Sequence, residues 1–194
     1  MDLLKNRSIS VATGRKEALH TLAEAIVSDV KKQAFANVTF ICTHNSRRSQ
    51  LAELMLSHLL KSKGILTIKC YSGGTEATAF NYRMVKALED YGIPLLKYGP
   101  EENPLYVADD NQYLFSKKYD DPFNPIKDFI AVTTCNHADE NCPVIFGAQQ
   151  RFHIAYKDPK HADDTAEESQ VYSDKVIEIG AEMLIVAQFI REKL

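Results

Sequence analysis

Hydrophobic positions along this chain follow the spacing of helices in some segments and form compact apolar runs in others. In residues 15–35, apolar side chains recur every three to four positions with charged residues between them, which predicts an N-terminal helix. The same spacing follows Ser49 and returns in residues 176–190, so two more helices are expected there. Another helix is predicted after Asn81, a residue suited to cap it, and it would end at Gly92.

Four short apolar runs rich in β-branched and aromatic residues predict strands. They are "NVTFIC" (37–42), "ILTIKCYSGG" (65–74), "FIAVTTC" (129–135) and "RFHIAY" (151–156). Because these runs alternate with helical segments, we expect a three-layer α/β fold: a four-stranded parallel sheet with helices on both faces, plus an added N-terminal helix. In such a fold, the ligand site lies beyond the carboxyl ends of the strands.

Two segments stand outside this alternation. Residues 1–36 are expected to form an N-terminal helical extension, and residues 37–194 an α/β domain. The helix of the extension should cover the core, although an exposed apolar face would also suit a dimer contact. Residues 97–127 are polar, contain four prolines and show no periodicity, which predicts an inserted loop or lid.

The composition narrows the class of protein. The 194 residues include 23 Lys and Arg and 26 Asp and Glu, a net charge of -3, without long runs of either sign. A sequence with this charge balance shows no basic patch of the kind that binds nucleic acid or an anionic membrane. The first residues lack the pattern of a signal peptide, and no stretch approaches eighteen consecutive apolar residues, so a cytoplasmic location is expected.

The stretch "ICTHNSRRS" places a cysteine at the end of a predicted strand and a helix just beyond it. A thiol at that position, Cys42, faces the positive end of the helix dipole and should ionise readily. Arg48 adds a fork suited to an oxyanion, and Ser49 is placed to donate a hydrogen bond to the thiolate. The backbone of the intervening loop can ring the anion, so the predicted substrate-binding residues are Thr43, His44, Asn45, Ser46, Arg47 and Arg48. The alternative is a buried strand cysteine with solvated arginines.

Two further cysteines lie at the end of another predicted strand. Cys135 ends the strand, and Cys142 follows seven residues later across the polar stretch "NHADEN". Two thiols separated by a flexible loop can pair if the loop refolds. A zinc pair and two unrelated thiols are the alternatives, but the six-residue gap exceeds the two to four residues usual in structural zinc sites.

A candidate general acid follows the fourth predicted strand. Asp158 stands at the strand's carboxyl end, and Pro159 stiffens the turn that carries it. Asp121 with Pro122 forms a second such dipeptide, but it lies in the insertion and follows no strand. Asp158 is therefore the favoured acid.

These segments together resemble a known family. "ICTHNSRRSQLAE" is similar to the active loop shared by low-molecular-weight protein tyrosine phosphatases and thioredoxin-coupled arsenate reductases; "YSGGTE" is similar to their following strand end, and "KDP" to their general-acid turn. "VTTCNHADENCP" resembles the reductase segment that carries the second and third redox cysteines, which the phosphatases do not need. The resemblance covers residues 37–194 except the insertion.

The resemblance implies a mechanism for arsenate reduction by three cysteines. Cys42 would attack arsenate held by the loop and Arg48, while Asp158 protonates the departing hydroxyl. Cys135 would then attack Cys42 and release arsenite, Cys142 would attack Cys135, and thioredoxin or a similar dithiol would reduce the disulfide. No tightly bound cofactor is implied. Some relatives hold a potassium ion at positions matching Asn45, Glu53 and Ser72, whose alternative role is hydrogen bonding within the loop.

Three residues depart from the family pattern. His44 replaces the usual glycine, a change that histidine tolerates if the position needs a positive φ. Arg47 replaces a cysteine or an apolar residue, and we expect it to face solvent. Lys157 stands where reductases often carry an acidic residue, and a cation there favours the ionised form of Asp158, which opposes its role as an acid.

Two other functions remain open from the sequence. A phosphatase acting on phosphotyrosine or aryl phosphates through a phosphocysteine intermediate needs only Cys42, Arg48 and Asp158. The tyrosines that eukaryotic phosphatases place after the Asp-Pro turn are missing, since "KHAD" follows Pro159. A sensor that binds an oxyanion without turnover is the third hypothesis.

Overall fold

A four-stranded parallel sheet forms the centre of the protein. The computed structural model describes residues 11–108, 112–141 and 144–194. The strand order is β2-β1-β6-β7, where β1 is Ala36–Cys42, β2 is Ile68–Gly74, β6 is Phe129–Thr133 and β7 is Ala148–His153. The predicted parallel α/β sheet is confirmed. The fourth strand lies three residues earlier than predicted, and its alternating burial is that of an edge strand.

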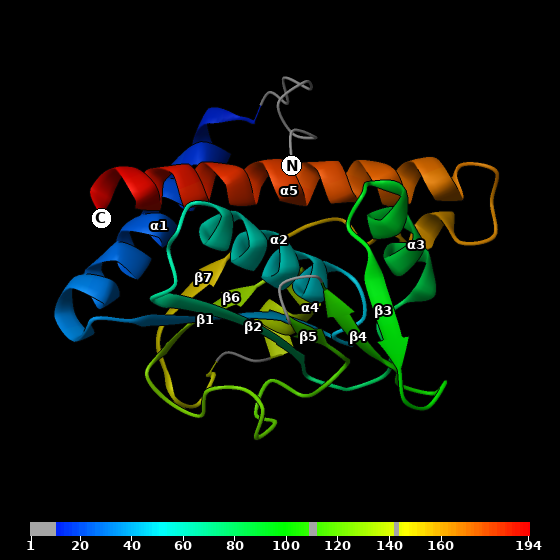
Figure 1. Ribbon diagram of the computed structural model, residues 1–194, viewed down its shortest axis with the longest axis horizontal. Coiled ribbons are helices and arrows are strands. Elements are labelled where there is room, and N and C mark those ends of the chain that lie inside the picture. The colour runs from blue at the N-terminus through cyan, green and yellow to red at the C-terminus, as the bar shows by residue number, and fades with distance from the viewer. Residues whose placement is uncertain (1–10, 109–111, 142–143) are drawn as a thin grey trace.

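Helices cover both faces of this sheet (Figure 1). They are α1 (Thr13–Gln33), α2 (Arg48–Ser62), α3 (Tyr82–Asp90), α4 (Asn136–Asn141) and α5 (Glu168–Lys193), with a short 3₁₀ helix, η1, over Pro159–Ala162. The long helix α5 contacts α1, α2 and α3, and with α1 and α2 it covers one face. Helix α4 packs on the other.

The pleat of β6 decides which core each side chain joins. Ile130 and Val132 pack into the large cluster beneath α1, α2 and α5. Phe129 and Ala131 point the other way, into a smaller cluster that also contains Cys42 and Cys135. Successive side chains of a strand point to opposite faces, so a strand covered on both sides is apolar throughout.

The N-terminal helix is part of the main core. Leu19, Leu22 and Ile26 of α1 are completely buried in the large cluster. The expectation that this helix covers the core is therefore confirmed. Burial of each such side chain contributes about 1.5–3 kcal/mol to stability. The helix ends at Ala34, whose φ of 69° breaks the helical path and directs the chain into β1.

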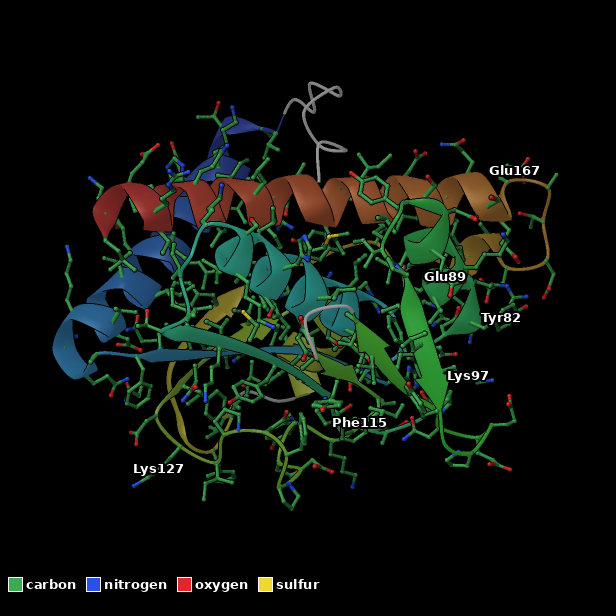
Figure 2. The ribbon with its side chains drawn as sticks, viewed as in Figure 1. Tyr82, Glu89, Lys97, Phe115, Lys127 and Glu167 are labelled. Carbon is green, nitrogen blue, oxygen red and sulfur yellow. The ribbon has the colours of Figure 1, made fainter. Side chains whose placement is uncertain are left out.

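The segment predicted as an inserted loop or lid, residues 97–127, contains regular strands in its first half. A second, antiparallel sheet is built from β3 (Leu95–Tyr98), β4 (Leu105–Ala108) and β5 (Tyr113–Leu114). Figure 1 shows it beside α3, and Figure 2 labels Lys97 on β3 and Phe115, the residue that follows β5. The strands have four residues or fewer, so they are too short to produce a recognisable alternation.

Among the described residues, the protein has no helix that is both long enough and apolar enough to cross a membrane.

Candidate active site

Parallel pairing brings two of the predicted cysteines to the same edge of the sheet. Ile41 of β1 pairs with Thr133 of β6, and the Thr134 N–H donates to the Ile41 carbonyl at 2.7 Å. Cys42 and Cys135 follow directly, and both are at most 4% exposed within one buried cluster. Residues that are 93 positions apart in the sequence therefore meet beyond the strand ends.

The loop after Cys42 turns its carbonyl groups outward. The Cys42 and Thr43 carbonyls accept from the Thr75 and Glu76 N–H groups, and the Ser46 carbonyl accepts from the Asn81 N–H. The His44 and Asn45 carbonyls accept from the side chains of Ser116 and Gln50. Because C=O and N–H point in opposite directions across a trans peptide, the N–H groups are left to face the interior of the loop. Helix α2 has no side-chain cap, so the N–H groups of its first turn also remain available to an anion.

Asn45, rather than His44, adopts the left-handed conformation in this loop, with a φ of 46°. Asparagine is among the non-glycine residues that tolerate that region best. Its side-chain amide donates to Ser49 Oγ at 2.9 Å and to Ser72 Oγ at 2.8 Å. Ser49 Oγ in turn lies 3.1 Å from Cys42 Sγ, as expected from the sequence. This network fixes the orientation of the thiol.

Arg48 and Asp158 meet at the mouth of the loop. Arg48 Nη2 donates to Asp158 Oδ2 at 2.6 Å, and Nη1 donates to the Tyr156 carbonyl at 3.0 Å. Arg48 Nε is buried and has no hydrogen-bond partner among the described residues. Asp158 also caps η1 by accepting from the Lys160 N–H at 3.0 Å. A small cleft lies between these groups, lined by Cys42, His44, Ser46, Arg47, Arg48 and Asp158.

The expectation that Arg47 faces solvent is wrong. Its side chain is only 11% exposed, and Nε donates to the Tyr172 hydroxyl at 3.0 Å. The guanidinium also lies 3.8 Å from Asp158 and 3.6 Å from Asp163. Tyr172 and Asp163 come from the C-terminal part of the chain, so these partners could not be recognised from the loop sequence. Arg47 thus joins Arg48 in holding Asp158.

Cys135 lies against the active loop. Its sulfur is 3.6 Å from Thr43 Oγ1 and accepts a hydrogen bond from the Ala138 N–H at 3.4 Å. His137 Nδ1 lies 3.2 Å from the same Thr43 hydroxyl. The polar stretch after Cys135 is not the flexible loop that was predicted, because residues 136–141 form the short helix α4. Cys142 lies outside the described residues, so neither its pairing with Cys135 nor the zinc alternative is tested.

Helix α4 is anchored to the sheet through Asp139. Its carboxylate accepts from Thr133 Oγ1 at 2.7 Å and from Arg151 Nη2 at 2.5 Å, and it lies 3.3 Å from His153. Burial raises the pKa of Asp139, but the hydrogen bonds from Thr133 and Arg151 and the charge of His153 outweigh it, so the pKa is lowered overall. The ionised form of Asp139 therefore holds α4 in place.

A strap from the insertion supports the active loop, which sequence reasoning missed. We use "strap" for residues 115–119. The Gly74 N–H donates to the Lys117 carbonyl and the Tyr119 N–H to the Gly74 carbonyl, both at 2.9 Å. Ser116 Oγ donates to the His44 carbonyl at 2.9 Å. No local motif marks these contacts, because they are made largely by backbone groups.

A second missed contribution comes from the N-terminal helix. Arg15 donates to both oxygens of Glu182 at 2.8 and 2.9 Å and to the Ala155 carbonyl at 3.1 Å, and it stacks on the Tyr156 ring. It thereby fixes the segment that leads to Asp158. Of the other residues that the sequence singled out, His44 lines the cleft, and its Nε2 is 3.5 Å from Glu76. Lys157 is exposed, and Asp121 caps a turn in the insertion instead of lining the cleft.

Comparison with known proteins agrees with this geometry. The family model for low molecular weight phosphotyrosine protein phosphatase matches residues 37–103. The chain is 33% identical over 145 residues to a protein named arsenate reductase from Shouchella clausii, covering 74% of this chain and 89% of that protein. It is 30% identical over 139 residues to the arsenate reductase of Bacillus subtilis, covering 72% and 85%.

Solved structures share the fold at lower identity. A low molecular weight phosphotyrosine phosphatase from Vibrio cholerae aligns with a TM-score of 0.54 and 17% identity, covering 79% of this chain and 95% of that one. A low molecular weight protein tyrosine phosphatase from T. tengcongensis gives 0.54 and 19%, covering 82% and 99%. With the identity and coverage of the curated relatives, these matches establish that the chain belongs to the family of the low molecular weight phosphatases and their arsenate reductase relatives.

Proposed function

We propose that this protein reduces arsenate to arsenite, with Cys42 as the nucleophile and Cys135 as the first thiol of a relay. The observation that carries the proposal is the position of Cys135, whose sulfur lies 3.6 Å from Thr43 in the active loop and in the same buried cluster as Cys42. Phosphate ester hydrolysis has no use for a second thiol there. The names of the curated relatives support the same reading.

The first step joins arsenic to sulfur. Arsenate enters the cleft, where the inward N–H groups of the loop and the Arg48 guanidinium bind its oxygens. The oxyanion replaces Asp158 as the partner of Arg48, which frees Asp158 to face the departing hydroxyl. The Cys42 thiolate forms the sulfur–arsenic bond, and the hydroxyl leaves as water with a proton from Asp158.

The second step transfers electrons to arsenic. The Cys135 thiolate attacks Cys42 Sγ, and a Cys42–Cys135 disulfide forms as the sulfur–arsenic bond breaks. The electron pair of that bond stays on arsenic, which is reduced from As(V) to As(III) and leaves as arsenite. Cys142 would then attack Cys135, which regenerates the Cys42 thiolate, and an external dithiol such as thioredoxin would reduce the resulting disulfide.

The relay requires α4 to unwind. The six residues between the two relay cysteines form a helix, which rises by about 9 Å over that length. A disulfide needs its two Cα atoms roughly 4.4–6.8 Å apart. We expect the pairing of Cys135 with Cys142 to require α4 to give up its helical form, a change that the anchoring contacts of Asp139 oppose.

The proposal is tested by arsenite release in the presence of thioredoxin, thioredoxin reductase and NADPH. The parent protein should turn over repeatedly. Cys135→Ser should stop multiple turnover, because the hydroxyl cannot form a disulfide with Cys42. Cys70→Ser, the same change at a half-buried cysteine on β2, should behave like the parent. Parent-like turnover of Cys135→Ser would contradict the relay.

Phosphatase activity is the second candidate, favoured by the family model and by a site in which Cys42, Arg48 and Asp158 line one cleft. The same two variants separate the candidates when aryl phosphate hydrolysis is measured. A phosphatase would hydrolyse aryl phosphates rapidly in the parent and in Cys135→Ser, and it would release no arsenite. Rapid arsenite release with slow ester hydrolysis supports the reductase.

Replacing the α4 anchor should accelerate the relay. In Asp139→Asn the carboxylate that binds Thr133 and Arg151 is lost, so α4 should unwind more readily and the Cys135–Cys142 disulfide should form several-fold faster. Stopped-flow mixing of reduced protein with a disulfide oxidant, followed by mass spectrometry, measures this rate. Asp90→Asn, an exposed aspartate on α3, is the control. An unchanged or slower rate would contradict the anchoring role.

The pH dependence of stability supplies a second readout for Asp139. Its pKa in the folded protein is lowered, so its stabilising contribution is present above the unfolded pKa of about 3.9 and is lost as pH falls through the folded pKa. The Tm of Asp139→Asn should therefore lie below that of the parent at neutral pH, and the difference should shrink in acid. A difference that is independent of pH would mean that the carboxylate charge is not responsible.

A further inference from the structure

A buried polar cluster lies directly beneath the active loop. It consists of Asn45, Glu53, Ser72, Gln112 and Lys117, none of which is more than 7% exposed. Asn45 binds Ser72, and Gln112 donates to Glu53 at 3.3 Å. Through Ser49, the same Asn45 side chain is connected to Cys42. Changes in the charge of this cluster can therefore reach the nucleophile and the anion site.

Three members of the cluster match the potassium site of some relatives, but their arrangement does not fit an ion. A backbone N–H can only donate, so the Asn45 atom 3.0 Å from the Lys117 N–H must be its oxygen. The amide nitrogen of Asn45 is then directed at Ser72 and Ser49. Within the described part of the cluster, two oxygens remain without a hydrogen-bond partner, Glu53 Oε2 and Gln112 Oε1. Hard cations such as Ca²⁺ take roughly six to eight oxygens, and two free oxygens fall far short.

The buried cluster contains a positively charged side chain, that of Lys117. Lys117 is 2% exposed, which is rare for lysine because burying an ammonium is costly. Its Nζ donates to the Phe115 carbonyl at 3.4 Å and lies 4.5 and 5.4 Å from the ring centres of Phe115 and Phe123. Aromatic faces stabilise a desolvated ammonium. The strap thus holds Lys117 in a fixed position beneath the loop, and Figure 2 shows Phe115 on this side of the sheet.

The charge of Lys117 acts on the cluster. Burial raises the pKa of Glu53, and Lys117 is the foremost of the groups that counteract this effect, ahead of the hydrogen bonds from Ser72 and Gln112. The backbone of Lys117 also binds Asn45 and Gly74 directly. Lys117 therefore supplies a buried cation, a backbone contact to the loop at Asn45 and another to Gly74 at the end of β2.

We infer that Lys117 is the resident cation of the active loop, so that the loop keeps its shape and its affinity for oxyanions without potassium. Lys117 is a positioning residue, since it contacts the loop and its supports and not the cleft. The inference concerns the loop itself and holds whether the enzyme reduces arsenate or hydrolyses phosphate esters. Binding of inorganic phosphate and thermal stability can therefore test it without any turnover.

The parent protein provides the first arm of the test. Its Tm and its phosphate dissociation constant, measured by calorimetry, should be the same in potassium chloride and in choline chloride at equal ionic strength. A higher Tm or tighter phosphate binding specific to potassium would overturn the inference. This arm requires no variant, so it stays decisive even if a substitution prevents folding.

Substitution of the lysine provides the second arm. Lys117→Met keeps the length and the apolar stem but removes the charge, and in choline chloride it should weaken phosphate binding by about tenfold, as expected for one poorly screened charge. Without the ammonium, Glu53 loses its main opposing charge, so potassium in the solvent-open groove that Glu53 lines should act as a loosely held counter-ion and restore part of the affinity. Lys118→Met, the adjacent exposed lysine, should match the parent. Parent-like binding by Lys117→Met, or a loss that potassium does not relieve, would contradict a cationic role.

Discussion

Cys42→Ser should abolish arsenate reduction and reduce aryl phosphate hydrolysis at least about a thousandfold. Cys42 is 3% exposed at the floor of the cleft. Among the described residues that line the cleft, it is the only one with a thiol. A serine hydroxyl at this position stays protonated, and it cannot enter a disulfide with Cys135. Steady-state arsenite release and p-nitrophenol release measure the two activities.

The fold of the Cys42→Ser protein should be unchanged. Ser49 and the loop carbonyls keep their partners, so inorganic phosphate should still bind and should raise the Tm of the variant by about as much as that of the parent. Cys70→Ser serves as the matched control, and both of its activities should remain. Retained arsenite release by Cys42→Ser would exclude Cys42 as the nucleophile. Loss of phosphate-induced stabilisation would show that the substitution damaged the loop instead.

Gly74→Ala should have the second-largest effect, on both stability and activity. A Cβ on Gly74 would lie 2.2 Å from the Glu76 carbonyl oxygen, 2.6 Å from that of Thr43 and 2.8 Å from the Asn45 nitrogen. All three are backbone atoms, and those of Thr43 and Asn45 belong to the active loop, where the Thr43 carbonyl is held by hydrogen bonds from Glu76 and Thr75. The loop itself must therefore shift. We expect a loss of about 1–3 kcal/mol in the free energy of unfolding and, for a displacement near 1 Å, about a hundredfold loss in kcat/KM.

Gly14→Ala is the matched control for this change. Gly14 is exposed near the start of α1, and an added Cβ would meet no atom within 4 Å. Alanine favours a helix over glycine by up to about 1 kcal/mol, so the Tm should stay level or rise, with parent activity. Urea unfolding and initial rates compare the two variants. A Gly74→Ala protein with parent stability and rate would show that the loop adapts to the methyl group.

The central sheet and the nucleophile loop were predictable because their signals are local. The apolar runs of β1 and β6 follow from burial on both faces, and the parallel arrangement follows from their alternation with helices. Cys42, Arg48 and Ser49 lie within eight residues, at the spacing that a strand, a loop and a helix start require. Once the strands are parallel, Asp158 and Cys135 must also lie at the carboxyl edge.

The partners of individual side chains were not predictable. Arg47 was expected in solvent, but it is bound by Tyr172 and Asp163, more than one hundred positions away. The segment that forms α4 was predicted to be a flexible loop. What stabilises the helix is the hydrogen bond from Arg151 of β7 to Asp139, which a local pattern does not reveal. Neither contact leaves a periodic or spaced pattern in the sequence. The strap was missed because its contacts to Gly74 are made by backbone groups.

By itself, the sequence determined the parallel α/β fold, the placement of Cys42 between a strand and a helix, and the order of the three motifs. These depend on the hydrophobic pattern and on short-range geometry, which neighbouring residues specify. Only the tertiary structure decided that two arginines hold Asp158, that α1 braces the segment before Asp158 through Arg15, and that Lys117 is buried beneath the loop. These features are contacts between residues that are far apart in the sequence. They form in the low-dielectric interior only when the whole chain has packed.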